Sequence, residues 1–228
     1  STFEINASAV KGPNGEYIII LHQQLITALG HYNETQMITG QLAISGSKEH
    51  EIASFLIEAY KEIIKCYKFK DYLPKFSQLP PILTRELYIL TLEKSLIQEL
   101  FLVAHEFAHI FLGHLSKTEE KTIHFQSEKN IQVKEYVKSQ QQELEADILA
   151  LKWIINAFKK ENLTLLSSVT NKNAPYYAVE VFMFLHMIEV NTNLYANYNK
   201  NASLYKELTP LEIAKRLIDI TIELDQLV

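Results

Sequence analysis

The chain has 228 residues, 47% of them hydrophobic, and a formal net charge of −5 at pH 7. Such a chain can bury one core, so we expect a single domain over residues 1–228, with an N-terminal lobe (1–80) and a helical core (81–228). Nucleic acid is not an expected partner because Lys and Arg form no cluster, and the single cysteine, Cys66, excludes an internal disulfide.

The N-terminal lobe is expected to begin with a β-hairpin. Residues 2–10 alternate loosely, residues 11–15 (KGPNG) are typical of a turn, and residues 17–21 (YIIIL) are β-branched and apolar. The hairpin either covers the core or lines a cleft in which its edge pairs with an extended peptide, and the sequence leaves both readings open.

Two helices are expected to follow the hairpin. The first is short, from His22 to Leu29, and ends near Gly30; residues 40–46 are expected to form a loop or short strand. The second covers residues 48–67, where apolar residues recur at helical spacing. Three prolines make residues 71–81 a rigid linker, after which Thr84 can cap a continuous helix from residue 85 to about residue 112, ended by Gly113.

The third helix contains the motif H-E-x-x-H, formed by His105, Glu106 and His109. Residues four apart lie on one helical face, so the two imidazoles can bind one metal ion while Glu106 reaches a water on it. Apolar residues flank the motif on every side, which predicts a buried helix. Buried imidazoles and carboxylates are costly unless they are paired or bind a metal, so the sequence favours a metal site over histidines that only fill the core.

A second motif, QQELEADILA, places Glu143 and Asp147 four residues apart on a later helix, expected over residues 143–158. A catalytic zinc ion held by two histidines needs a third protein ligand and one open position, and Glu143 can be that ligand. Asp147 can accept a hydrogen bond from the outer nitrogen of His105 or His109 and so orient the ring. Glu145 points about 160° away from Glu143 and is the weaker ligand candidate.

Residues 116–142 connect the two motifs and are polar, so a solvated loop or lid is expected, with residues 131–137 forming either a strand or the start of the next helix. His114 lies nine residues after His105 and would point about 180° from it on a continuing helix. We therefore expect His114 at the helix end or in the outer layer of the site, and not as a ligand. Apolar helices are expected over residues 177–190 and 211–227.

The segments HEFAHIFLGH and ELEADILA resemble the gluzincin class of zinc peptidases, in which H-E-x-x-H is completed by the first Glu of E-x-x-x-D. The second segment is most similar to the CAAX-prenyl-protease and HtpX family, and the first is similar to IrrE/ImmA-like and Lit-like phage-exclusion peptidases. The resemblance covers residues 96–152 well and residues 176–217 loosely. In the first family a His-Pro followed by Arg often stands in the later region, where this chain has Thr209-Pro210 and Arg216.

The expected fold is α+β and mainly α, a zincin-like helical domain with a small N-terminal sheet or hairpin. The expected function is a zinc metalloendopeptidase that cleaves a protein or peptide through a zinc-bound water, with Glu106 as the general base. The resemblance adds a bacterial regulatory or phage-defence role. The oxyanion needs a second electrophile, for which we favour His186 among candidates that include Tyr136, Tyr176, Tyr177 and Arg216.

Two rival functions remain at this stage: a catalytically inactive zinc-binding regulatory protein and a toxin-like effector. The intact Glu106 argues against the first, because a purely structural site has no use for a base. No membrane span is expected, since the most apolar window, residues 96–115, contains several ionisable groups. The expected location is the cytoplasm; because the chain begins at Ser1 and not at Met, removal of a signal or anchor is the open alternative.

Overall fold

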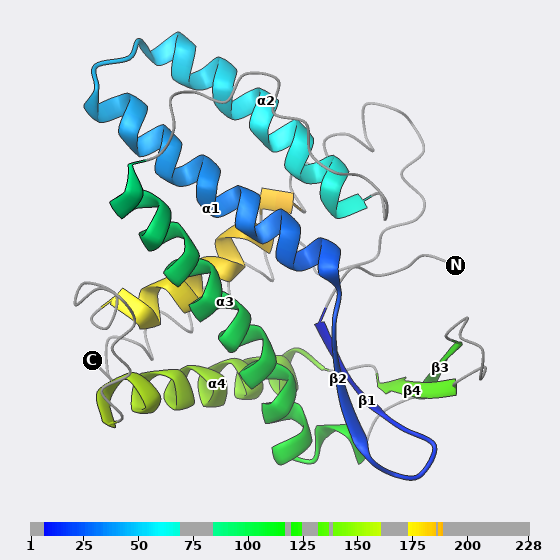
Figure 1. The fold of residues 1–228 in the computed structure, drawn as a ribbon. Helices are drawn as coiled ribbons and strands as arrows, with labels where there is room; N and C mark the ends of the chain where they lie inside the picture. The colour runs from blue at the N-terminus through cyan, green and yellow to red at the C-terminus, as the bar shows by residue number, and fades with distance from the viewer. Residues whose placement is uncertain are drawn as a thin grey trace.

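The computed structural model describes residues 7–68, 84–116, 120–124, 132–136, 139–160, 173–185 and 187–188. These residues form β1 (Ala7–Lys11), β2 (Tyr17–Leu21), α1 (Gln23–Ile44), α2 (Glu49–Lys68), α3 (Arg85–Phe111), the 3-10 turn η1 (His114–Ser116), β3 (Glu120–His124), β4 (Gln132–Tyr136) and α4 (Gln140–Lys160). Residues 173–185 and 187–188 are also helical. The molecule is therefore mainly helical with one small antiparallel sheet, as the sequence predicts (Figure 1).

The sheet has the strand order β2-β1-β4-β3. The expected hairpin is present, with register from Ala7 opposite Leu21 to Lys11 opposite Tyr17. The other edge of β1 pairs with β4 only at Val10 and Lys11. The polar segment expected as a loop or lid thus supplies two strands, and of the two alternatives for residues 131–137 the strand is the one observed.

Helix α1 is much longer than the sequence predicts, because it runs from Gln23 to Ile44 without ending at Gly30. Gly40 also lies inside it, so the expected loop or strand over residues 40–46 is wrong for most of its length. A glycine inside a helix costs about 1 kcal/mol relative to alanine. The buried residues of α1 continue at helical spacing past Gly30, and their packing outweighs that cost: Leu25, Ala28, Leu29, Tyr32, Thr35 and Ile38.

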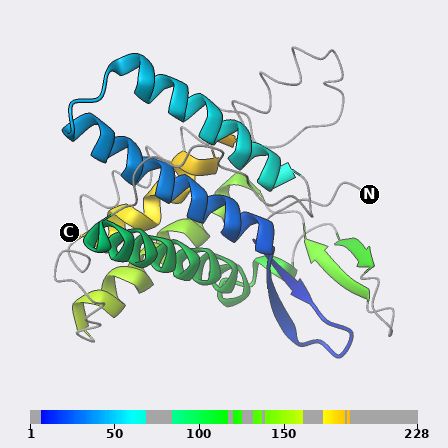
Figure 2. The same ribbon diagram turned by 45° about the horizontal axis from the view of Figure 1, so that its top comes forward.

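Helix α3 lies at the centre of the fold and packs against α1, α4 and β1 (Figures 1 and 2). Its N-terminus is capped as expected, since the Thr84 hydroxyl accepts a hydrogen bond from the amide of Leu87. The buried side of α3 joins a core with α4 and the helix over residues 173–185, in which Phe101, Leu151 and Phe182 are buried. Phe101 meets Phe182 edge-on, with ring centroids 5.6 Å apart.

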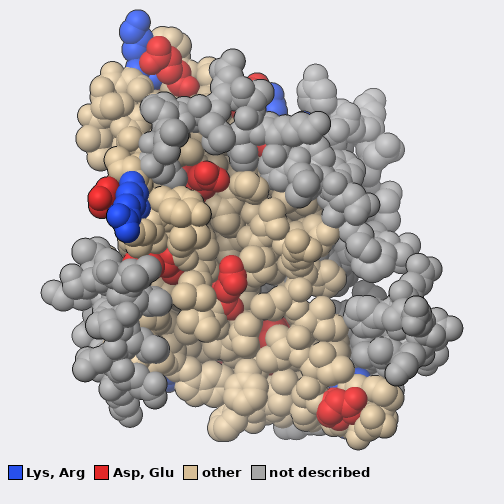
Figure 3. Space-filling model, viewed as in Figure 1, with Lys and Arg blue, Asp and Glu red and all other residues tan. Residues whose placement is uncertain are grey.

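The opposite side of α3 is exposed, which corrects the expectation that the helix is buried all round. The face seen in Figure 3 is largely uncharged, with isolated acidic groups and a few Lys or Arg side chains toward its edges. Along α3 the exposed apolar side chains recur every three or four residues: Tyr88, Leu92, Leu96, Leu100, Val103, Phe107 and Phe111. The cause is uneven packing, because the described neighbouring elements cover the motif face more fully, although Phe107 and Phe111 still contact the ring of Trp153 on α4. No helix in the described ranges is long and apolar enough to cross a membrane.

Candidate metal centre

Three side chains from α3 and α4 converge on one point. His105 and His109 stand on successive turns of α3, and their Nε2 atoms lie 3.1 Å apart. The Glu143 carboxylate reaches them from the first turn of α4, with one oxygen 3.3 Å from the His105 Nε2 and the other 3.4 Å from the His109 Nε2. Among the described residues, His105, His109 and Glu143 form a group that could hold a metal ion.

The spacing of these donor atoms fits a tetrahedral zinc ion. Ligand atoms about 2.1 Å from a tetrahedral zinc lie about 3.4 Å from each other. The two Nε2 atoms are 3.1 Å apart, each of them lies within 3.4 Å of one of the two Glu143 oxygens, and one ligand atom from each residue can be chosen with all three within 4.8 Å of one another. Two imidazole nitrogens and one carboxylate are also a donor set of catalytic zinc sites. The residues that the sequence selects as ligands are thus brought together in a geometry that could hold the metal.

Asp147 holds the outer side of the first histidine. It is fully buried on α4, and its Oδ1 lies 2.7 Å from the Nδ1 of His105. Burial alone would lower the pKa of His105, but the charges and contacts of Asp147 and then Glu143 outweigh burial and raise that pKa to about 10. The sequence left open which ring Asp147 would contact, and the structure brings it to His105.

Glu106 is buried beside the ligands and is held by the sheet. Its Oε2 accepts a hydrogen bond of 2.7 Å from the backbone amide of Ala9 in β1. Its Oε1 lies 3.9 Å from the Nε2 of His105, on the side where the donor atoms converge. One carboxylate oxygen is therefore fixed by the backbone, while the other faces the candidate metal position.

His114 contacts the second histidine from beyond the end of α3. The helix ends at Phe111, and Gly113 adopts the left-handed conformation with φ 70°. The chain therefore turns back, and the His114 Nδ1 comes within 3.0 Å of the Nδ1 of His109. On its other side, the His114 Nε2 lies 3.1 Å from the Oε2 of Glu145. The expectation that His114 lies in the outer layer of the site agrees with this placement.

Small residues allow the two helices to approach closely. Ala108 on α3 and Ala146 and Ala150 on α4 are all fully buried. Glu143 and Asp147, four residues apart, flank Ala146 on the side of α4 that faces α3. Close approach at this crossing brings the short carboxylate of Asp147 to the ring of His105.

Of the candidates for the second electrophile, the two whose side chains the structure describes, Tyr176 and Tyr177, do not lie beside the donor atoms. His186 and Arg216 lie outside the described residues, as does the side chain of Tyr136. Tyr176 is exposed, and the ring of Tyr177 lies 5.9 Å from the Lys94 ammonium, about three turns along α3 from His105.

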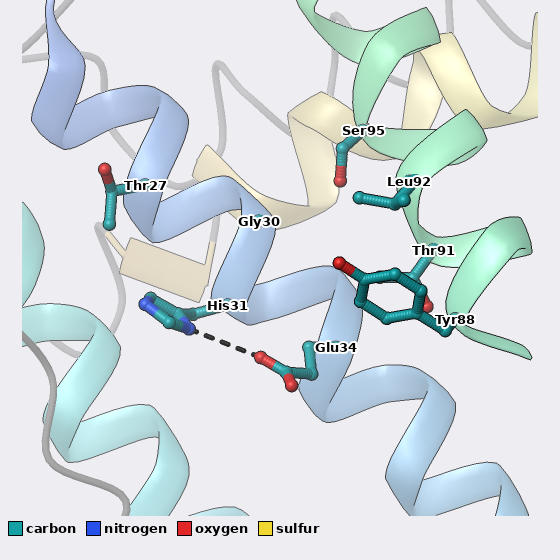
Figure 4. Close-up of a pocket in the computed structure, with 8 residues that line it drawn as sticks. All are labelled: Thr27, Gly30, His31, Glu34, Tyr88, Thr91, Leu92 and Ser95. Atoms are coloured by element: carbon teal, nitrogen blue, oxygen red, sulfur yellow. Dashed lines mark ion pairs between the residues drawn. The ribbon is translucent and has the colours of Figure 1, made fainter. Parts of the chain in front are cut away.

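A hollow of about 190 Å³ lies elsewhere, between α1 and the N-terminal half of α3. Figure 4 shows Thr27, His31 and Glu34 on one side of it and Tyr88 and Leu92 on the other. His31 and Glu34 form an ion pair of 3.4 Å at its edge. This hollow contains none of the converging donors and is separate from the candidate metal centre.

Two contacts were missed by sequence reasoning. The Ala9 amide is separated from Glu106 by 97 residues, and no side-chain pattern could reveal a backbone donor. The contact of Glu145 with His114 could have been found, because Gly113 signals a helix end and a reversal. Because the chain reverses at Gly113, the angle of about 180° between His114 and His105, which holds only for a continuing helix, does not apply.

Comparison with known proteins gives one family. The family model described as Peptidase U49 matches residues 17–200, a range that includes both motifs. No curated protein and no solved structure matches the chain.

Proposed function

Because the chain belongs to the peptidase U49 family, a family of peptidases, we propose that it is a zinc metalloendopeptidase that hydrolyses peptide bonds of a protein substrate. The observation that carries the proposal is the convergence of His105, His109 and Glu143 at separations of 3.1 to 3.4 Å. One ligand atom from each of the three side chains lies within 4.8 Å of the others, so they could hold one tetrahedral ion and leave a fourth position for solvent or substrate. This arrangement corresponds to the gluzincin pattern.

In this proposal His105, His109 and Glu143 hold the zinc ion, and Asp147 orients His105 so that its Nε2 lone pair faces the ion. The buried carboxylates of Glu106 and Asp147 add negative charge beside the histidines, which favours a cation at this point. When bound, zinc supplies Lewis-acid chemistry, because it lowers the pKa of water and polarises the scissile carbonyl.

Glu106 is the proposed general base. Its Oε1 takes a proton from the attacking water and then delivers it to the nitrogen of the leaving amine as the C–N bond breaks. The hydrogen bond from Ala9 to Oε2 keeps the carboxylate in one orientation and leaves Oε1 for the proton transfers. The product is a free carboxylate and a free amine, with water as the only other reactant.

We keep His186 as the proposed second electrophile for the oxyanion. Phe182 precedes it by four residues and packs on Phe101, which in turn lies beside the ring of His105 at a centroid distance of 6.3 Å. The helix that leads to His186 therefore passes close to the site. The proposed substrate is a protein or peptide, and a regulatory or phage-defence role rests on the motif resemblance alone.

The proposal is tested with Glu106→Gln, which removes the base and keeps the ligands. We expect the variant to retain stoichiometric zinc, measured by elemental analysis, and to lose cleavage by at least about 100-fold, as is typical for loss of a general base. Cleaved products in cells expressing either protein are compared by proteomics. The matched control is Glu58→Gln, an exposed carboxylate on α2 that should keep wild-type activity.

Undiminished cleavage by Glu106→Gln would refute the mechanism. Absence of cleavage in the wild type, with zinc still bound, would favour the alternative of a zinc-binding regulatory protein.

A further inference from the structure

The two proposed ligand histidines have different outer partners. His105 is held by a carboxylate, Asp147, whereas His109 is held by another imidazole, His114. His109 is fully buried and His114 is 6% exposed, so water does not readily substitute for either contact. The contact between His109 and His114 does not follow from the H-E-x-x-H motif, since His114 lies beyond the helix that carries the motif.

The proton positions along this chain of contacts follow from the proposed zinc site. If the His109 Nε2 lone pair faces the metal, the neutral ring carries its proton on Nδ1 and donates it to the Nδ1 of His114. His114 then carries its own proton on Nε2, which donates to the Oε2 of Glu145 at 3.1 Å. Every donor in this series of contacts thus meets an acceptor, and the series ends at the carboxylate of Glu145. The side-chain amide of Gln141 donates to the other oxygen of that carboxylate, Oε1, at 2.9 Å.

We propose that His114 and Glu145 are positioning residues of the metal site, which hold His109 with its Nε2 toward the ion and so set the metal affinity. The inference rests on the proposed zinc function and extends it by two residues. His114 fixes the tautomer and the rotation of the His109 ring. Glu145 accepts the hydrogen bond from the Nε2 of His114, which makes the Nδ1 of His114 a better acceptor. An outer partner of this kind typically changes metal affinity by 10- to 100-fold when it is removed.

The test measures the zinc dissociation constant by competition with a chromophoric chelator. His114→Phe keeps the ring volume and removes both nitrogens, and we expect zinc to bind about 10- to 100-fold more weakly. His114→Gln should restore most of the affinity, because its amide oxygen can accept from His109 while its amide nitrogen donates to Glu145. Glu145→Ala should weaken binding by a smaller factor, since this carboxylate is half exposed and water can replace it.

Matched controls are His50→Phe and Glu58→Gln, both exposed on α2 and far along the chain from the site.

A second readout, by NMR, does not depend on the zinc affinity. In the zinc-loaded protein the Nδ1 proton of His109 should give a slowly exchanging NMR signal, which should broaden or disappear in His114→Phe. If His114→Phe does not fold, Glu145→Ala and this signal decide the question.

The variant Glu143→Ala removes a proposed ligand and serves as the reference for loss of zinc. If it binds zinc more weakly while His114→Phe and Glu145→Ala keep the wild-type dissociation constant, this inference alone is overturned. Wild-type protein that binds no zinc would overturn the proposed function and this inference together. Full activity of Glu106→Gln would overturn only the mechanism, because the affinity shifts of His114→Phe would stand.

Discussion

The two histidines of the candidate metal centre meet different chemistry at their outer nitrogens. A buried carboxylate next to His105 raises its pKa and makes the ring a stronger donor toward a cation. At the outer nitrogen of His109 lies another imidazole, that of His114, and the carboxylate on that side, Glu145, lies one ring further out. The outer nitrogens of the two proposed ligands therefore contact different groups, although both ligands are histidines of one motif.

Glu143 is the residue whose loss should affect the metal most directly. In Glu143→Ala, only His105 and His109 remain as ligands, so we expect zinc affinity to fall by more than about 100-fold, beyond the effect of an outer partner. Elemental analysis after dialysis measures the occupancy. Asn156→Ala, which truncates an exposed side chain on the same helix, is the control and should keep one equivalent. Full occupancy in Glu143→Ala would place the third ligand elsewhere.

At the scale of elements, the two ends of α3 set where its motif stands. Thr84 caps the first turn, and the helix then continues for 27 residues to Phe111. Beyond it, Leu112 donates its amide to Ala108 and Gly113 donates to Ile110, which closes the last turn. The left-handed Gly113 directs η1 back toward α3, so one backbone conformation brings His114 to His109.

Gly113→Ala should therefore destabilise the protein and disturb the site. A residue with a Cβ in the left-handed region costs about 1 to 2 kcal/mol, so urea unfolding should show a loss of that size. Asn tolerates this conformation better, and Gly113→Asn should lose less. If the reversal at Gly113 brings His114 to His109, zinc affinity should fall in Gly113→Ala and should fall less in Gly113→Asn. Equal stability of the three proteins would contradict the role of the turn.

At the scale of the whole molecule, the proposed metal would join two helices that are already packed through the core. Its ligands come from α3 and α4, and the same helices share buried contacts through Phe101 and Leu151. The hairpin adds a third attachment, because the Ala9 amide binds Glu106. The sheet, the central helix and α4 thus meet at one point, and the metal would stabilise their arrangement without being needed to build the core.

Removal of the metal should lower the melting temperature without preventing folding. A ligand present at 100 times its dissociation constant stabilises the native state by about 2.7 kcal/mol, which corresponds to about 5 to 10 °C for a chain of this size. Thermal unfolding with and without a chelator measures the shift, and added zinc should restore it. The same chelator should leave Glu143→Ala unchanged; an equal shift in that variant would mean that the chelator acts at another site.

Much of the candidate centre could be predicted because its parts are local. The placement of His105 and His109 on one face depends only on the helical repeat, and so does the pairing of Glu143 with Asp147. The helix boundaries at Thr84 and Gly113 follow from a hydroxyl that can cap and a residue that accepts positive φ. In contrast, Gly30 was a misleading local signal, because packing on both sides of it carries α1 through to Ile44.

The sequence by itself determined the helical repeat of both motifs, the hairpin and the capped start of the central helix, since each depends on interactions within a few residues. Only the tertiary structure decided that Asp147 contacts His105, that the Ala9 amide holds Glu106, and that one side of α3 remains exposed. Those contacts join residues far apart in the chain. They depend on how close two packed elements come and on their relative rotation, and a helical period specifies neither.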